Sequence, residues 1–282
     1  EGGELRGRNN WVKYNYQDFC NCSPPEGFLR ESPPRPLREG EVEVCPTCEF
    51  TQLGEAIRAA APGATIRLGP GHYSGPVGIA KDLILIGAGP GHTRVAGVRI
   101  GGDAVVELHN FTISNSNPYE TGLYAGVKAR VTLMNCVLSN SRGSGLEVTG
   151  EAQVNIRDCT INGNGDMGLW ARGSARIVLE DSAVTENRFH GLLLEGSVLL
   201  NLENCVIQGN GWAGICVMHE VQVTVCNSVI RNNQGWGLVA IIGSAPYEEF
   251  TGEVVLQNNE IYGNGEGDVC LPDLCLPEDA CK

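Results

Sequence analysis

Charged residues are scarce in this sequence, and basic residues are the scarcest. Only 20 Lys and Arg stand against 33 Asp and Glu, so the formal net charge is −13. A basic surface is needed to neutralise a phosphate backbone, and this balance therefore argues against a nucleic acid as partner. It also argues mildly against an anionic polysaccharide, unless a cation bridges the two.

Long hydrophobic runs are absent as well. No stretch reaches the roughly 18 consecutive apolar residues of a membrane-spanning helix, so we expect no membrane span. The 12 cysteines are instead typical of a protein in an oxidising compartment. We therefore expect a mature chain that has lost a leader and is secreted, periplasmic or at the cell surface.

Glycine, by contrast, is abundant and periodic. An aliphatic residue follows a glycine every 23 residues, at Gly122, Gly145, Gly168, Gly191, Gly214 and Gly237. Each unit holds three short runs of alternating apolar and polar residues, which is typical of strands with one buried face. The pattern predicts an all-β fold, a single-stranded right-handed parallel β-helix with three strands per rung and about eight rungs. A leucine-rich repeat is the nearest rival, but it would need a helical or convex return.

A column of asparagines and a short helix complete the expected coil. We expect the asparagines at a turn, because Asn tolerates a left-handed backbone and its amide can bond to the rungs above and below. The column consists of Asn164, Asn187, Asn210, Asn233 and Asn264. The first rung exposes a sheet edge, and we expect a helix over 51–61, with Thr51 as its N-cap, to cover that edge.

Composition divides the chain into three parts. Residues 1–50 form a Pro- and Cys-rich N-terminal extension, residues 51–265 the β-helix, and residues 266–282 an acidic, Cys-containing tail. Acidic residues dominate 246–282, which we interpret as a solvated tail or, alternatively, as a calcium or partner site.

Two segments carry a resemblance to a known superfamily. Residues 51–73 read TQLGEAIRAAAPGATIRLGPGHY and residues 82–89 read DLILIGAG. They resemble the opening of pectin-lyase-like β-helix proteins, most of all the NosD-like and general β-helix repeat members. The resemblance covers roughly 51–265 and implies the fold, but not the function, because these families mix enzymes, binders and structural proteins.

The cysteines inside the expected coil fall into two groups. Cys136, Cys159 and Cys205 share one column and are interpreted as small buried thiols, with a Cys136–Cys159 disulfide as the alternative. Cys216 and Cys226 are interpreted as outward-facing, able to pair with each other or with the tail.

The cysteines at the two ends are expected to be bonded. In the N-terminal extension, two disulfides or a four-thiolate zinc site would use Cys20, Cys22, Cys45 and Cys48. In the tail, disulfides that staple it across the last rung would use Cys270, Cys275 and Cys281.

The outward face of the strands that follow the repeated glycines is the candidate binding surface. Aromatic rings stack on pyranose faces, while carboxylates and guanidinium groups bind hydroxyls. The residues that could form such a glycan groove are Trp170, Trp212, Trp236, Phe189, Arg188 and Asp166. The alternatives are a protein or filament contact, and burial of the rings beneath the 241–253 insertion or the tail.

Catalytic signals are weaker. The candidates on this face are Glu147, Glu195, Arg172 and His190. Glu147 and Glu195 lie two rungs apart, roughly 10 Å, which only marginally fits the carboxyl pair of a glycosidase. Motifs of polygalacturonases, methylesterases, epimerases and pectate lyases are missing from the rungs that can be aligned.

The sequence therefore predicts a secreted or cell-surface scaffold that is a non-catalytic structural or binding protein. The expected partner is a polysaccharide or another protein, including a second copy of the chain. The alternatives are a polysaccharide lyase or glycoside hydrolase of an unrecognised family, and a NosD-like periplasmic metal-maturation factor that rests on the resemblance alone. No cofactor is expected, although calcium or zinc could bind.

Overall fold

The structure is a computed structural model that describes residues 40–118, 120–240 and 250–271. The chain is divided after Pro36 into two units, of which the second is Leu37–Lys282. Every described residue belongs to the second unit.

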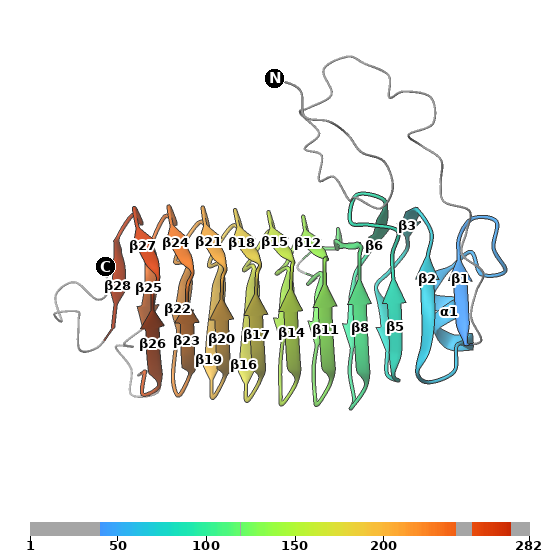
Figure 1. The fold of residues 1–282 in the computed structure, drawn as a ribbon, viewed down its shortest axis with the longest axis horizontal. Coiled ribbons are helices and arrows are strands. Elements are labelled where there is room, and N and C mark those ends of the chain that lie inside the picture. Colours follow the sequence, from blue (N-terminus) through green and yellow to red (C-terminus); the bar gives the residue numbers. More distant parts are fainter. Residues whose placement is uncertain (1–39, 119, 241–249, 272–282) are drawn as a thin grey trace, which may run out of the picture. The chain divides into compact units, whose positions relative to one another are not determined.

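The described strands form three parallel sheets that the chain visits in turn, as Figure 1 shows. Sheet A contains β1 (Glu41–Val44), β2 (Ala64–Leu68), β5 (Leu83–Ile86), β8 (Val105–His109), β11 (Arg130–Met134), β14 (Gln153–Arg157), β17 (Arg176–Glu180), β20 (Leu199–Glu203), β23 (Gln222–Cys226) and β26 (Glu253–Gln257). Sheet B contains β3 (Gly71–Tyr73), β6 (Thr93–Val95), β9 (Thr112–Ile113), β12 (Val137–Ser139), β15 (Thr160–Asn162), β18 (Ala183–Thr185), β21 (Val206–Gln208), β24 (Val229–Arg231) and β27 (Glu260–Tyr262). Sheet C contains β4 (Val77–Ile79), β7 (Val98–Ile100), β10 (Leu123–Ala125), β13 (Leu146–Val148), β16 (Leu169–Gly173), β19 (Leu192–Gly196), β22 (Ile215–Val217), β25 (Trp236–Ala240) and β28 (Gly267–Cys270).

This architecture confirms the expected parallel β-helix with three strands per rung. Sheets B and C each have nine strands, so the coil makes about nine turns rather than the expected eight. The third strand of every rung excludes the leucine-rich repeat. The coil also includes β1 from the segment assigned to the extension and β28 from the segment assigned to the tail.

The register matches the 23-residue period. Leu169 pairs with Leu146 on one side and with Leu192 on the other, so equivalent residues stack directly. Val223 pairs with Val254, which places the extra residues of that rung outside the ladder. Because like positions stack, the inward columns form one continuous buried core inside the coil.

The helix α1 (Leu53–Ala59) lies at the beginning of the coil and contacts β1, β2 and β4. Its apolar face is buried at Leu53, Ala56 and Ile57, as expected for a cap on the first rungs. The N-cap prediction was wrong, because Gln52 holds that position in an extended conformation and makes no side-chain capping hydrogen bond. Thr51 lies one residue too early to bond the free N–H groups of the first turn.

The asparagine ladder is confirmed. Each ladder Nδ2 up to that of Asn233 donates to the Oδ1 of the next asparagine at 2.9–3.0 Å, and that of Asn264 donates to Asp268 Oδ1 at 3.1 Å. These Nδ2 atoms each donate to a sheet B carbonyl oxygen at 3.1–3.3 Å, and each Oδ1 also accepts a backbone N–H of the preceding rung at 3.1 Å. Every polar atom of these amides is therefore satisfied inside the turn.

The ladder asparagines do not supply the left-handed backbone that we expected of them. Positive φ values fall instead in other columns, which include the position directly before the ladder at Asn140, Glu186 and Asn232. A further column lies between sheets A and B and consists of Asn110, Asn135, Asp158, Asp181, Asn204, Asn227 and Asn258. The chain turns sharply there between two strands, and Asn and Asp tolerate that conformation better than other residues with a Cβ.

The repeated glycines are explained by the ladder. A Cβ added to Gly191 would lie 2.8 Å from Asn210 Nδ2 and 2.6 Å from the carbonyl oxygen of Gly214. Equivalent clashes occur at the other glycines of this column from Gly145 to Gly237. Glycine is therefore required because the backbone approaches the asparagine of the next rung too closely for a side chain.

The cysteines of the inward column are buried free thiols, as predicted, and the alternative Cys136–Cys159 disulfide is not formed. Burial raises the pKa of the Cys205 thiol to about 11. These thiols act as small core residues whose sulfurs bond to backbone oxygens of neighbouring strands.

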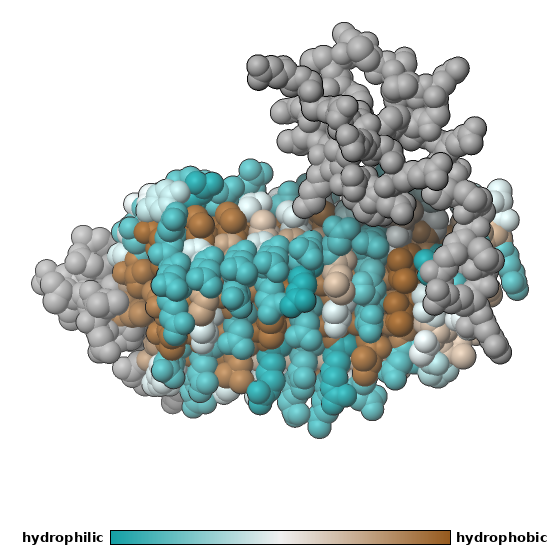
Figure 2. Space-filling view, viewed as in Figure 1, coloured by the Kyte–Doolittle hydropathy of each residue, from teal (hydrophilic) through white to brown (hydrophobic). Residues whose placement is uncertain are grey.

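The outer surface of sheet A is mostly polar. Figure 2 shows hydrophilic residues across most of this side, separated by hydrophobic bands. Arg157 and Glu180 form an ion pair between neighbouring rungs here. Within the part of the chain that the structure describes, no helix has the length and apolar character needed to cross a bilayer.

Replacing Asn210 with Ala should lower the free energy of unfolding by about 3 kcal/mol. The change removes the acceptor of the Asn187 backbone N–H and of the Asn187 side-chain amide, and it removes the donor to the Val184 carbonyl oxygen. Urea denaturation followed by circular dichroism measures the loss. Asn201→Ala on the exposed face of β20 is the control, and an equal effect of both substitutions would contradict the role of the ladder.

Replacing Val127 with Gly should raise the free energy of unfolding by about 1 kcal/mol. Val127 has a φ of 62° and an exposed side chain, and its column continues with Gly150, Gly173 and Gly196 before His219. A β-branched residue is strained in this region, so removing the side chain relieves the strain. Thermal unfolding of the variant checks this, and the reverse change Gly150→Val should destabilise the coil.

Candidate functional site

The candidate face is the outer surface of sheet C together with the turns that lead into it. Trp170 lies on β16, Trp236 begins β25, and Trp212 lies in the turn before β22. The structure therefore brings the three predicted tryptophans to one sheet, but their surroundings differ.

The centre of this face is an apolar cluster. Leu193, Cys216 and Val239 point outward from the coil and are nevertheless buried, together with Ala213 and Cys270. The partly buried side chains that pack against them are Met167, Trp170, Met218 and Trp236. Trp170 and Trp236 therefore pack against this apolar cluster and are partly buried. One alternative was that the 241–253 insertion or the tail covers these rings. Most of those residues lie outside the described ranges, so this alternative stays a prediction.

The predicted pairing of Cys216 and Cys226 is contradicted. Both are free thiols, and they lie on different sheets, on β22 and β23. Cys216 faces outward as expected but is completely buried, and burial raises the pKa of its thiol to about 12. It is therefore protonated and unreactive at neutral pH.

The acidic catalytic candidates belong to one network across three rungs. Arg172 donates to Glu147 Oε1 at 2.5 Å and its guanidinium carbon lies 4.3 Å from the centre of the Trp170 ring. Trp170 Nε1 donates to Glu195 Oε2 at 2.8 Å. Glu147 Oε2 also accepts the hydroxyl of Thr121 at 3.2 Å. These contacts hold both carboxylates in a structural role on the sheet surface.

His190 does not join that network. Its Nδ1 accepts the backbone N–H of Ala213 at 3.2 Å, and its ring meets the Trp212 ring edge-to-face with centroids 5.1 Å apart. The side chain is 7% exposed, and burial lowers its pKa to about 4. A buried neutral imidazole of this kind supports the turn rather than acting as a general acid.

Trp212 is the exposed aromatic residue of the face. Its side chain is 54% exposed, while its ring contacts Phe189 edge-to-face with centroids 5.0 Å apart. Arg188 lies over the other ring of this pair, 5.3 Å from the centre of Phe189. We call Phe189 and Trp212 the aromatic ledge. Burial raises the pKa of the neighbouring Asp166, and Arg188 opposes that shift.

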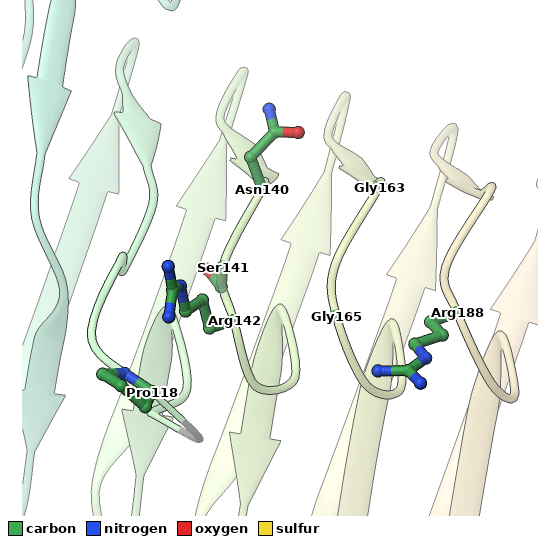
Figure 3. A pocket seen from close by; sticks show the side chains of 7 residues that line it. All are labelled: Pro118, Asn140, Ser141, Arg142, Gly163, Gly165 and Arg188. Atoms are coloured by element: carbon green, nitrogen blue, oxygen red, sulfur yellow. The ribbon is translucent and has the colours of Figure 1, made fainter.

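A groove runs beside the aromatic ledge along the turns between sheets B and C (Figure 3). It has a volume of about 440 Å³ and is lined by Pro118, Asn140, Ser141, Arg142, Gly163, Gly165 and Arg188. Arg188 was predicted from the sequence, whereas Arg142 was missed. Its position in the repeat could have identified it, because each of the two arginines directly follows a residue of the ladder column.

The terminal cysteines are bonded where the structure describes them. Cys45 and Cys48 form a disulfide with a Cα–Cα distance of 5.0 Å, and Cys270 is disulfide-bonded. The remaining predicted partners, Cys20, Cys22, Cys275 and Cys281, lie outside the described residues. Among the described residues, no three His, Cys, Asp or Glu side chains gather in a metal-binding arrangement.

The buried His190 should make stability fall in mild acid. The unfolded imidazole takes up a proton near pH 6.5, whereas the folded one stays neutral down to about pH 4. The unfolded state therefore binds more protons in this window, and acidification through it removes about 3 kcal/mol of stability, with no further loss below it. Urea titrations across this window should show a smaller loss for His190→Asn, which keeps an acceptor for Ala213. Identical losses would contradict the assignment.

The comparisons with known proteins concern this same coil. The family described as right-handed β-helix region matches residues 96–251, more than half of the chain. No curated protein sequence matches. Among solved structures, pectate lyase Pel9A is similar over 79% of this chain and 79% of its own, with 14% identity and a TM-score of 0.55. The A-module of mannuronan C-5 epimerase AlgE6 from Azotobacter vinelandii is similar over 75% of this chain and 71% of its own, with 20% identity and a TM-score of 0.50.

Likeness at these identities concerns the fold alone, and it agrees with the three parallel sheets and their register. Together with the match over 96–251, it leads to one conclusion: the chain belongs to the right-handed β-helix family.

Proposed function

We propose that this chain is an exported, non-catalytic β-helix that binds a glycan at the aromatic ledge. The exposed ring of Trp212 carries the proposal. A large aromatic side chain that is more than half exposed and held at a fixed angle offers a flat apolar surface to a pyranose ring.

The backbone around Trp212 is held by the rungs on both sides. Its N–H donates to the carbonyl oxygen of Phe189 at 3.1 Å, and its own carbonyl oxygen accepts the N–H of Gly235 at 3.0 Å. The edge-to-face contacts with Phe189 and His190 restrict the ring itself. Little conformational entropy is therefore lost when a ligand binds, which favours affinity.

The state of the carboxylates supports binding without turnover. Glycoside hydrolysis needs one carboxyl group free to donate a proton and a second free to act as base or nucleophile. Glu147 is instead bonded to Arg172 and Thr121, and Glu195 is bonded to Trp170. We therefore expect no release of reducing ends or unsaturated sugars from any polysaccharide that the chain binds.

The disulfide state supports export. Disulfides such as Cys45–Cys48 persist in oxidising compartments and are rare in reducing ones. The remaining described thiols are buried or partly buried, so they are protected from oxidation.

Replacing Trp212 with Ala should weaken glycan binding about tenfold, which corresponds to roughly 1.4 kcal/mol. A glycan array identifies the ligand, and isothermal titration calorimetry compares the two proteins. Tyr262→Ala is the matched control, because Tyr262 is an exposed aromatic residue on sheet B. Absence of any glycan ligand, or full binding by the Trp212 variant, would contradict the proposal.

A further inference from the structure

The position that directly follows the ladder column alternates between long side chains and glycine. In rung order this row reads Arg142, Gly165, Arg188, Gly211, Gln234 and Gly265. The row therefore repeats every two rungs, although the coil itself repeats every rung. We call it the alternating row.

The glycines of the row are required by the backbone. A Cβ at Gly165 would lie 2.5 Å from the carbonyl oxygen of Arg142, and one at Gly211 would lie 2.0 Å from that of Arg188. A side chain cannot occupy these rungs without moving the main chain. The long residues therefore stand two rungs apart, and the groove lies between Arg142 and Arg188.

The two arginines form no ion pair, in contrast to several arginines on the sheets of the coil. Arg157 and Arg172 each form an ion pair with a glutamate of a neighbouring rung. Arg142 and Arg188 are exposed and form no ion pair among the described residues, while Arg188 lies over the Phe189 ring and attracts the carboxylate of Asp166. The two guanidinium groups are the charged groups that line the groove, in a chain of net charge −13, and they favour an anion there.

The main chain at the two arginines is held in register. The N–H of Arg142 donates to the carbonyl oxygen of Asn115 at 2.9 Å, and that of Arg188 donates to the carbonyl oxygen of Asn164 at 3.0 Å. In Figure 3 both side chains lean in the same direction, Arg188 toward the rung of Gly163 and Gly165 and Arg142 toward Pro118. Since a rung rises about 4.8 Å, equivalent atoms of the two side chains are about 10 Å apart.

We propose that the alternating row binds an acidic glycan whose carboxylate or sulfate groups recur at this two-rung spacing, as they do when every second sugar is acidic. Each anionic group meets one arginine, and the intervening sugar lies over the glycine rung. Guanidinium groups suit this task because their planar donors bind oxyanions in pairs. The aromatic ledge is continuous with the row through Arg188 and Phe189, so the inference rests on the proposed function and specifies its ligand.

The test uses the full chain and a hyaluronan octasaccharide, in which every second sugar carries a carboxylate. Calorimetry at low ionic strength should show about fivefold weaker binding for Arg142→Gln and for Arg188→Gln, and about 25-fold weaker binding for the double variant. Carboxyl-reduced hyaluronan should bind weakly and be insensitive to both changes. Arg176→Gln, which removes an exposed arginine from sheet A, is the matched control and should leave binding unchanged.

A gain-of-function variant tests the spacing itself. Gln234 is exposed and occupies the next long position of the row, so Gln234→Arg should add a third cation two rungs beyond Arg188. It should tighten octasaccharide binding about fivefold, whereas Gln153→Arg on sheet A should not. Arginine variants that bind hyaluronan like the parent protein, or a Gln234 variant without gain, would overturn the inference.

Further binding measurements distinguish sulfate from carboxylate groups, a glycan from an acidic peptide, and failure of this inference from failure of the proposed function. Tighter binding of chondroitin 4-sulfate that is lost in the arginine variants would assign the groups to sulfate, and comparable binding of hyaluronan to carboxylate. Equal binding of a polyglutamate peptide would overturn the glycan in favour of an acidic protein segment. Loss of binding in Trp212→Ala without any effect of the arginine variants would overturn this inference and leave the proposed function standing.

Discussion

The backbone of each repeated glycine lies against the side-chain amide of the ladder asparagine in the next rung, and this contact sets the geometry of the coil. Gly191, for example, has no room for a Cβ because Asn210 and Gly214 occupy the space. The amide in turn binds the asparagine above it, the asparagine below it and a carbonyl oxygen of sheet B. The two residue types therefore depend on each other, and any rung that lost one would leave buried polar groups unpaired.

The outer columns are freer, because they are not part of this contact. Sheet A presents mostly polar residues, whereas sheet C presents an apolar cluster around Cys216 and, at its margin, the exposed ring of Trp212. A scaffold in which like positions stack can place one kind of side chain at a fixed repeat along its length. The alternating row is an example, since its arginines follow the ladder column directly and inherit its regular spacing. Recognition of a repeating polymer is a natural use of such a surface.

On the candidate face, the polar side chains that could serve catalysis are hydrogen-bonded to other groups of the protein. Glu147 and Glu195 are near enough in sequence register to suggest a carboxyl pair, yet Arg172, Thr121 and Trp170 occupy them. His190 is similarly committed, because it accepts a backbone N–H and is buried against Trp212. The guanidinium groups of Arg142 and Arg188 line the groove and form no ion pair with a described residue. These contacts are the basis for proposing a site that holds a ligand without transforming it.

The sequence by itself determined the coil. Columns such as Leu146, Leu169 and Leu192 specify strand, register and core, because a parallel coil stacks equivalent residues and each column must satisfy one environment. The asparagine ladder follows from the same periodicity. Only the tertiary structure decided which outward residues are exposed: it buries Cys216, leaves Trp212 open and gathers Arg142 with Arg188 in one groove. Periodicity states on which face a side chain lies, but exposure and partners depend on the lengths and contacts of neighbouring side chains, which differ from rung to rung.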